Sequence, residues 1–155
     1  MTLVDEVELI VRLLNSTFNG RAWHGPSLMD ALKGVDETHA RVRPFEGRHT
    51  IWEIVDHCAF WMRVVQGVLM GEEHPKSGEE LDDWPPMKEE GSWFGSVEEL
   101  VESQRSLVEV IHDYSRPLDK NVSGTGVTYL ELLHGIIHHN LYHAGQIGIL
   151  KRKTS

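Results

Sequence analysis

The chain has 155 residues, about the length of one domain, and a formal net charge of −9 with histidine neutral. Its 15 Lys plus Arg stand against 24 Asp plus Glu, so no basic face is available for a phosphate backbone and we exclude a nucleic-acid partner. The single cysteine, Cys58, excludes an intramolecular disulfide framework and a Cys-rich zinc site. Ten histidines leave imidazole as the ligand type for a transition-metal site.

The apolar segments are too short to cross a membrane. None approaches the roughly 18–20 residues that a spanning helix requires. The first six residues include Asp5 and Glu6 and lack the basic start of a secretory signal. We therefore expect a cytoplasmic domain without a membrane partner.

Apolar residues recur at helical spacing in four long segments. The first spans residues 3–18 and is stopped by Asn19-Gly20. A short helix is expected after Ser27, and one or two further turns fit residues 36–43. The second long helix begins after Thr50, with Glu53 completing a capping box, and continues to about residue 70.

A long loop follows around residues 72–95, rich in proline, glycine and acidic residues. Trp84, Trp93 and Phe94 suggest that this loop is tied to the rest of the domain. The third helix is expected to begin at Ser96, with Glu99 at the capping-box position, and the fourth spans residues 128–151. These elements predict an all-α four-helix bundle, one domain over residues 1–155, with short extra helices.

The fourth helix carries two histidine pairs at i, i+4 spacing, His134/His138 and His139/His143. Either pair would place two imidazoles on one face, about one turn apart, where they can share an ion. On a helical wheel, His139 and His143 share a line with core residues, whereas the other pair lies at the opposite edge of the apolar arc. The wheel favours His139 and His143 and keeps the other pair as an alternative.

The second helix supplies one histidine, His57, on a line with Ile54 and Trp61 beside the apolar stripe. A single histidine there is more often a hydrogen-bonded core residue. Together with an inward His-x-x-x-His pair, however, it completes three histidines from two helices, the ligand set of a catalytic zinc site with an open position. Imidazole also suits nickel, copper and iron, so the ligand type does not name the metal.

The other polar candidates have simpler interpretations. His24 follows a tryptophan in a loop and could line a pocket or a surface turn. Asp56 points about 100° away from its neighbour His57 on the helix, which predicts a surface position. Four further histidines fall in polar surroundings and are expected to be solvated: His39, His49, His74 and His112.

Three segments carry recognisable motifs. Residues 47–57 read Gly-Arg-His-Thr-Ile-Trp-Glu-Ile-Val-Asp-His and are followed by Phe60-Trp61. Residues 139–147 contain His-x-x-x-His followed by Gly-Gln, and residues 22–28 read Ala-Trp-His-Gly-Pro-Ser-Leu. In order and spacing these segments resemble the two metal-ligand motifs and one branch's opening segment in the DinB/YfiT-like metalloenzyme family.

The resemblance implies an up-down-down-up bundle, often a homodimer, with one divalent ion bound by His57, His139 and His143. Zinc or nickel is the expected ion, with iron or manganese as alternatives. Thiol-dependent transferases and the mycothiol-dependent maleylpyruvate isomerase are similar to this family. A low-molecular-weight thiol is therefore an expected partner, beside a small-molecule substrate.

Neutral imidazoles leave a bound ion its full charge, which favours deprotonation of a water or a thiol. The chain is thus expected to be a metal-dependent hydrolase or thiol-dependent transferase, and the alternative is a non-catalytic, metal-stabilised bundle that serves in binding. Glu53 could orient His57 or act only as the helix cap, and Gln146 could hydrogen-bond a ligand of the metal. The further pocket candidates are Tyr142, His24 and Trp61.

Overall fold

The computed structural model describes residues 2–75, 82–90 and 92–154. Over these residues the chain forms six helices, and the prediction of an all-α fold is confirmed. The long helices are α1 (Leu3–Asn19), α4 (Ile51–Leu69), α5 (Trp93–Asp113) and α6 (Tyr129–Thr154). The short ones, α2 (Leu28–Leu32) and α3 (Glu37–Arg41), lie between α1 and α4 in the chain.

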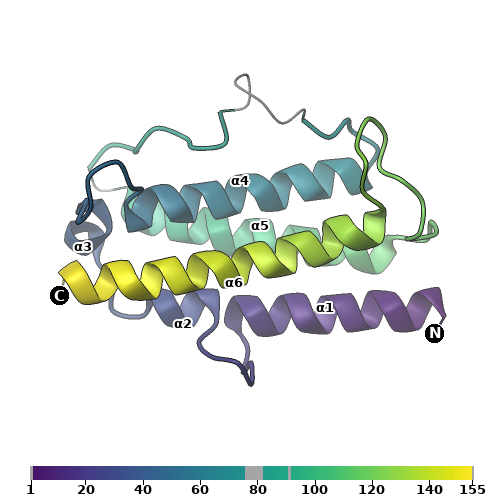
Figure 1. Ribbon diagram of the computed structural model, residues 1–155, viewed down its shortest axis with the longest axis horizontal. Coiled ribbons are helices and arrows are strands. Elements are labelled where there is room, and N and C mark those ends of the chain that lie inside the picture. The colour runs from purple at the N-terminus through teal and green to yellow at the C-terminus, as the bar shows by residue number, and fades with distance from the viewer. Residues whose placement is uncertain (1, 76–81, 91, 155) are drawn as a thin grey trace.

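The four long helices lie side by side along the length of the molecule (Figure 1). α4 packs against both α5 and α6, and α1 packs against the other side of the same two helices. α1 and α6 run in one direction, whereas α4 and α5 run in the other (Figure 1). Because α4 and α5 are parallel, the connection between them has to return along the whole bundle, which explains the length of the loop predicted around residues 72–95.

The apolar stripes of the four helices meet in one core. Each long helix contributes side chains with no exposed surface, for example Leu14, Met62, Leu107 and Leu133. Burying a side chain of this size is worth roughly 1.5–3 kcal/mol. The core fixes which face of each helix points inward, and so it also fixes where polar residues at the edge of that face lie.

Helices α1 to α4 begin with a capping side chain, whereas α5 begins without one. The predicted Thr50–Glu53 capping box at the start of α4 is confirmed. The predicted start of α5 at Ser96 is wrong, because the helix begins three residues earlier, at Trp93. Ser96 is buried and accepts a hydrogen bond from Trp52 Nε1 at 2.9 Å, so its hydroxyl serves the core rather than a helix end.

The loop before α5 is only partly described, since residues 76–81 and 91 lie outside the described ranges. Of its described residues, 82–90 run over α4 (Figure 1). Within the described residues, the helices are too short or too polar to cross a membrane.

Candidate metal centre

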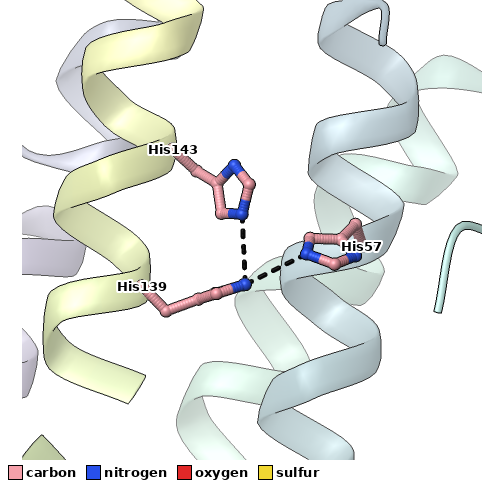
Figure 2. A group of neighbouring side chains, drawn as sticks. All are labelled: His57, His139 and His143. Atoms are coloured by element: carbon pink, nitrogen blue, oxygen red, sulfur yellow. Dashed lines mark hydrogen bonds between the residues drawn. The ribbon is translucent and has the colours of Figure 1, made fainter. Parts of the chain in front are cut away.

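Three histidines from two helices meet in the interior of the bundle. His57 lies in the middle of α4, while His139 and His143 lie one turn apart on α6. The Nε2 atom of His139 is 3.0 Å from Nε2 of His57 and 3.1 Å from Nε2 of His143. Figure 2 shows the three rings pointing into the space between the two helices. The structure thus brings together the three histidines that the sequence singled out.

The alternative pair on α6 points elsewhere. His134 is partly exposed and His138 is exposed, although their rings lie 6.1 Å apart and could face a common partner. His139, by contrast, is partly buried, and His143 is only 3% exposed. The wheel's preference for the inward pair therefore agrees with the arrangement of α6 against α4.

Burial keeps the three imidazoles neutral. Loss of solvent, together with the neighbouring His143 and His57, lowers the pKa of His139 to about 3. Burial likewise lowers the pKa of His143 to about 4 and lowers the pKa of His57. At pH 7 each ring therefore keeps a nitrogen lone pair, the form in which histidine binds a metal.

Two of the rings have their orientation and tautomer set by hydrogen bonds. His57 Nδ1 donates to the backbone carbonyl of Asp83 at 2.6 Å, and His143 Nδ1 donates to Gln146 Oε1 at 2.7 Å. Since the proton is on Nδ1 in both rings, each Nε2 presents its lone pair to the centre. This pattern, in which the second nitrogen of a ligating histidine is held by an oxygen, is typical of metal sites.

The centre therefore has an excess of lone pairs. His139 Nε2 can donate at most one proton, yet it faces two acceptors, and its buried Nδ1 has no hydrogen-bond partner among the described residues. A cation would relieve this repulsion. Metal–nitrogen bonds of about 2.0–2.1 Å at angles of 90–109° separate two ligating nitrogens by roughly 2.9–3.4 Å, which matches the observed spacing. The three side chains thus fit a divalent ion.

The loop of residues 82–90 forms part of the centre. The indole of Trp84 stacks on His57, with ring centroids 3.8 Å apart. Asp83 accepts from His57 through its carbonyl and from Trp61 Nε1 through its carboxylate, at 3.1 Å. The aromatic residues of the sequence, Trp84 among them, pointed to an anchored loop, but no sequence signal indicated the role of Asp83. That role depends on a backbone carbonyl, which every residue carries.

A pocket opens beside His143, with a volume of about 310 Å³. His143 and Gln146 lie on its inner wall, and Tyr142, which is exposed, lies on its rim. The outer wall is formed by residues from the turn before α4 and from the loop: Phe45, Arg48, His49 and Trp84. A volume of this size suits a small molecule.

The other residues predicted to support the site lie at different distances from the three histidines. Glu53 closes the capping box, accepts from the Thr50 backbone N–H at 2.7 Å and pairs with Arg43 at 2.6 Å, so its carboxylate is occupied at the helix start rather than at His57. Trp61 lies at the edge of the cluster, 6.4 Å from the rings of His57 and His139. His24 lines a different groove, against Gly145 and Gly148 of α6.

Three residues have surroundings that differ from those predicted. His49 is not simply solvated, because its ring stacks on the free face of Trp84 with centroids 3.4 Å apart. His74 contacts Trp61, with ring centroids 6.0 Å apart. Asp56 is only 4% exposed and lies 3.3 Å from Lys88, so the predicted surface position is wrong. In each case the partner comes from a segment far away in the sequence or from the loop, beyond the reach of local periodicity.

A helical bundle with three convergent imidazoles is typical of metal-binding helical proteins. Comparison with family models assigns the chain more narrowly: the model of the DinB superfamily matches residues 22–147. This match covers most of the chain, and the protein belongs to the DinB superfamily. Neither the curated proteins nor the solved structures contain a significant match to it.

Proposed function

We propose that this DinB-superfamily protein is a metal-dependent enzyme whose divalent ion is held by His57, His139 and His143. The observation that supports the proposal is the convergence of three neutral imidazole lone pairs, two of them fixed by hydrogen bonds at Nδ1. Three histidines leave further coordination positions, and the adjacent pocket would give a small molecule access to them. When bound, the ion would act as a Lewis acid that lowers the pKa of a thiol or water.

We further propose that the reaction is a thiol-dependent transfer rather than a hydrolysis. In the part of the chain that the structure describes, the lining of the pocket includes no carboxylate to serve as a general base for water. A thiol needs less assistance, since its pKa starts nearer neutrality. The protein does not provide this thiol, because Cys58 is fully buried and burial raises the pKa of its sulfur.

The thiol would therefore be a small-molecule substrate. In the transfer, its sulfur forms a bond to an electrophilic carbon of the second substrate, and the leaving group departs with the electrons of the broken bond. The thiol proton passes to water. Asp83 orients the imidazole of His57, and Gln146 orients that of His143. The walls of the pocket would surround the reacting atoms.

Metal analysis tests the first part of the proposal. Protein purified without a His tag and reconstituted with zinc or nickel should hold about one ion per chain, and His139→Ala should lose it. His138→Ala is the matched control, because the neighbouring His138 is exposed. If the wild-type protein holds no stoichiometric metal and melts at the same temperature as His139→Ala, the metal site is refuted.

Assays with added thiols test the second part. The reconstituted protein should convert an electrophile such as 1-chloro-2,4-dinitrobenzene only when bacillithiol, mycothiol or glutathione is supplied, and His139→Ala should not. Turnover of ester or amide substrates without a thiol would instead establish a hydrolase. A stoichiometric ion with no turnover in either assay would favour the non-catalytic, metal-stabilised bundle.

A further inference from the structure

The pocket beside His143 has an unusual charge for this protein. The chain carries a formal net charge of −9, yet among the described residues the lining of the pocket contains one arginine, Arg48, and no aspartate or glutamate. A small cleft lined by one sign of charge raises the local concentration of ligands of the opposite sign. The wall of this pocket therefore favours an anionic group over a neutral or cationic one.

The backbone of Arg48 is held in place. Its N–H donates to the carbonyl of Phe45 at 3.2 Å, and its own carbonyl accepts from the guanidinium of Arg43. The turn between them has Gly47 at φ +66°, in the left-handed region that glycine adopts readily. Arg43 is fixed in turn by Glu53, at the first turn of α4. Arg48 thus projects from a turn that is fastened to the same helix as His57.

The two arginines of this turn have different roles. The guanidinium of Arg43 is taken up by the Glu53 carboxylate at 2.6 Å. Within the described residues, by contrast, no carboxylate pairs with the guanidinium of Arg48. Unpaired arginines occur elsewhere on the surface, but Arg48 is the cation of the pocket that also contains His143. Its charge is available to a ligand.

The rest of the outer wall is apolar. Phe45, Tyr142 and Ile149 line the pocket and expose 42%, 64% and 64% of their surfaces. Exposed apolar side chains gathered around one cavity are typical of a binding site. The edges of this pocket would cover the carbon skeleton of a ligand, while Arg48 would bind its charged end.

From this arrangement we propose that the pocket takes a substrate with an apolar carbon skeleton and a carboxylate that pairs with Arg48. A single guanidinium matches the charge of one carboxylate, and its planar fork can bind both carboxylate oxygens. The inference rests on the proposed function, since it places the opposite end of this substrate near the three histidines. It identifies the substrate class as carboxylic acids, with the thiol or the electrophile at the far end.

The test uses cobalt-loaded protein at pH 7 and pairs of thiols that differ only in charge. The first pair is 3-mercaptopropionate and 3-mercapto-1-propanol, and the second, longer pair is 6-mercaptohexanoate and 6-mercapto-1-hexanol. Binding of each thiol is followed by its sulfur-to-cobalt charge-transfer band, which reports a Kd without any turnover. In the wild-type protein, at least one carboxylate should bind about tenfold more tightly than its matched alcohol.

Variants at Arg48 separate recognition from a general effect. In Arg48→Ala the two members of each pair should bind equally, with the Kd of the alcohol unchanged, whereas Arg48→Lys should retain part of the preference. Arg116→Ala is the matched control, because it removes the same charge beside a different groove, at the far end of α4. Its preference for the carboxylate should equal that of the wild-type protein.

Different results would refute the role of Arg48 and the metal centre. Equal binding of acid and alcohol by the wild-type protein, or an equal loss of both in Arg48→Ala, would overturn the role of Arg48 and leave the metal site intact. An identical loss of preference in Arg116→Ala would also overturn it, since the effect would then come from net charge. Failure to take up cobalt would refute the metal centre, and the assignment of its substrate with it.

Discussion

The indole of Trp84 lies flat on the imidazole of His57, with ring centroids 3.8 Å apart and planes inclined by 6°. The opposite face of the same indole stacks on His49, which lines the pocket. Trp84 comes from the loop before α5, and it therefore links that loop both to a proposed metal ligand and to the wall of the pocket. The loop acts as a supporting element of the centre rather than as a simple connection.

Removing the indole should weaken metal binding. In Trp84→Ala, His57 loses the surface that fixes its ring plane, and we expect the affinity for zinc to fall by about tenfold, the lower end of what loss of a supporting group costs. Trp84→Phe keeps an aromatic face and should retain most of the affinity. Competition with a chromophoric chelator measures both variants, and circular dichroism checks that helix content is unchanged. Equal zinc affinity in Trp84→Ala and wild type would show that the stacking has no role in the centre.

The hydrogen bond from His143 Nδ1 to Gln146 Oε1, at 2.7 Å, should also contribute to metal affinity. Gln146→Ala removes the acceptor that fixes the tautomer, and we expect metal affinity to fall by about 10- to 100-fold. Gln146→Glu supplies a carboxylate oxygen at the same place and should bind zinc at least as well as the wild-type protein. If both substitutions weaken binding equally, the acceptor at this position does not tune the ligand.

Much of the centre was predictable because it depends on local periodicity. The positions of His57, His139 and His143 relative to the apolar stripes follow from 100° per residue, and packing of the stripes then brings α4 and α6 together. The Thr50–Glu53 capping box was readable for the same reason, since its partners are three residues apart.

The remaining features depend on contacts between distant segments. Asp83 reaches His57 across 26 positions of sequence through a backbone carbonyl, which carries no sequence signature. Asp56 sits on a face that a single helix would expose, but the loop covers that face and brings Lys88 to within 3.3 Å. Ser96 is drawn into the core by Trp52, 44 positions earlier, so a capping pattern there was misleading.

Glu53 should make stability depend on pH. Burial raises the pKa of this carboxyl, but hydrogen bonds from Arg43 and from the Thr50 backbone outweigh burial, and the net pKa lies below its ordinary value of 4.5. A group with a depressed folded pKa stabilises the protein above its unfolded pKa and loses that contribution as the pH falls through the folded pKa. The effect of Glu53 is therefore complete above about pH 5 and disappears at more acidic pH.

Glu53→Gln isolates this charge, since an amide can still cap the helix. At pH 7 we expect the variant to be about 1 kcal/mol less stable than the wild-type protein, and the difference to close below about pH 4. Urea unfolding at pH 7, 5 and 3.5 measures it, with Glu8→Gln as the control on an exposed face of α1. A difference that stays constant over this range would show that the carboxylate charge is not involved.

The ion pair between Lys88 and the buried Asp56 anchors the loop to α4. Asp56 is 4% exposed, whereas Lys88 is 37% exposed and also pairs with Glu99 at 2.7 Å. Lys88→Met should strand the Asp56 carboxylate and cost about 2 kcal/mol, less than the 3–5 kcal/mol of a fully buried pair because water still reaches the lysine. Glu99→Gln removes the exposed partner and should cost less than about 0.5 kcal/mol.

The double variant Asp56→Asn/Lys88→Met decides whether the stranded charge is the cause. It removes both charges, so it should be more stable than Lys88→Met alone by about 1 kcal/mol or more, because no unpaired carboxylate remains. Urea denaturation of the wild-type protein, Asp56→Asn, Lys88→Met and the double variant measures all four free energies of unfolding in this double-mutant cycle. If the double variant is no more stable than Lys88→Met, the loss comes from the packing of the lysine's methylene chain against the bundle, and the ion pair itself does not hold residues 82–90 over α4.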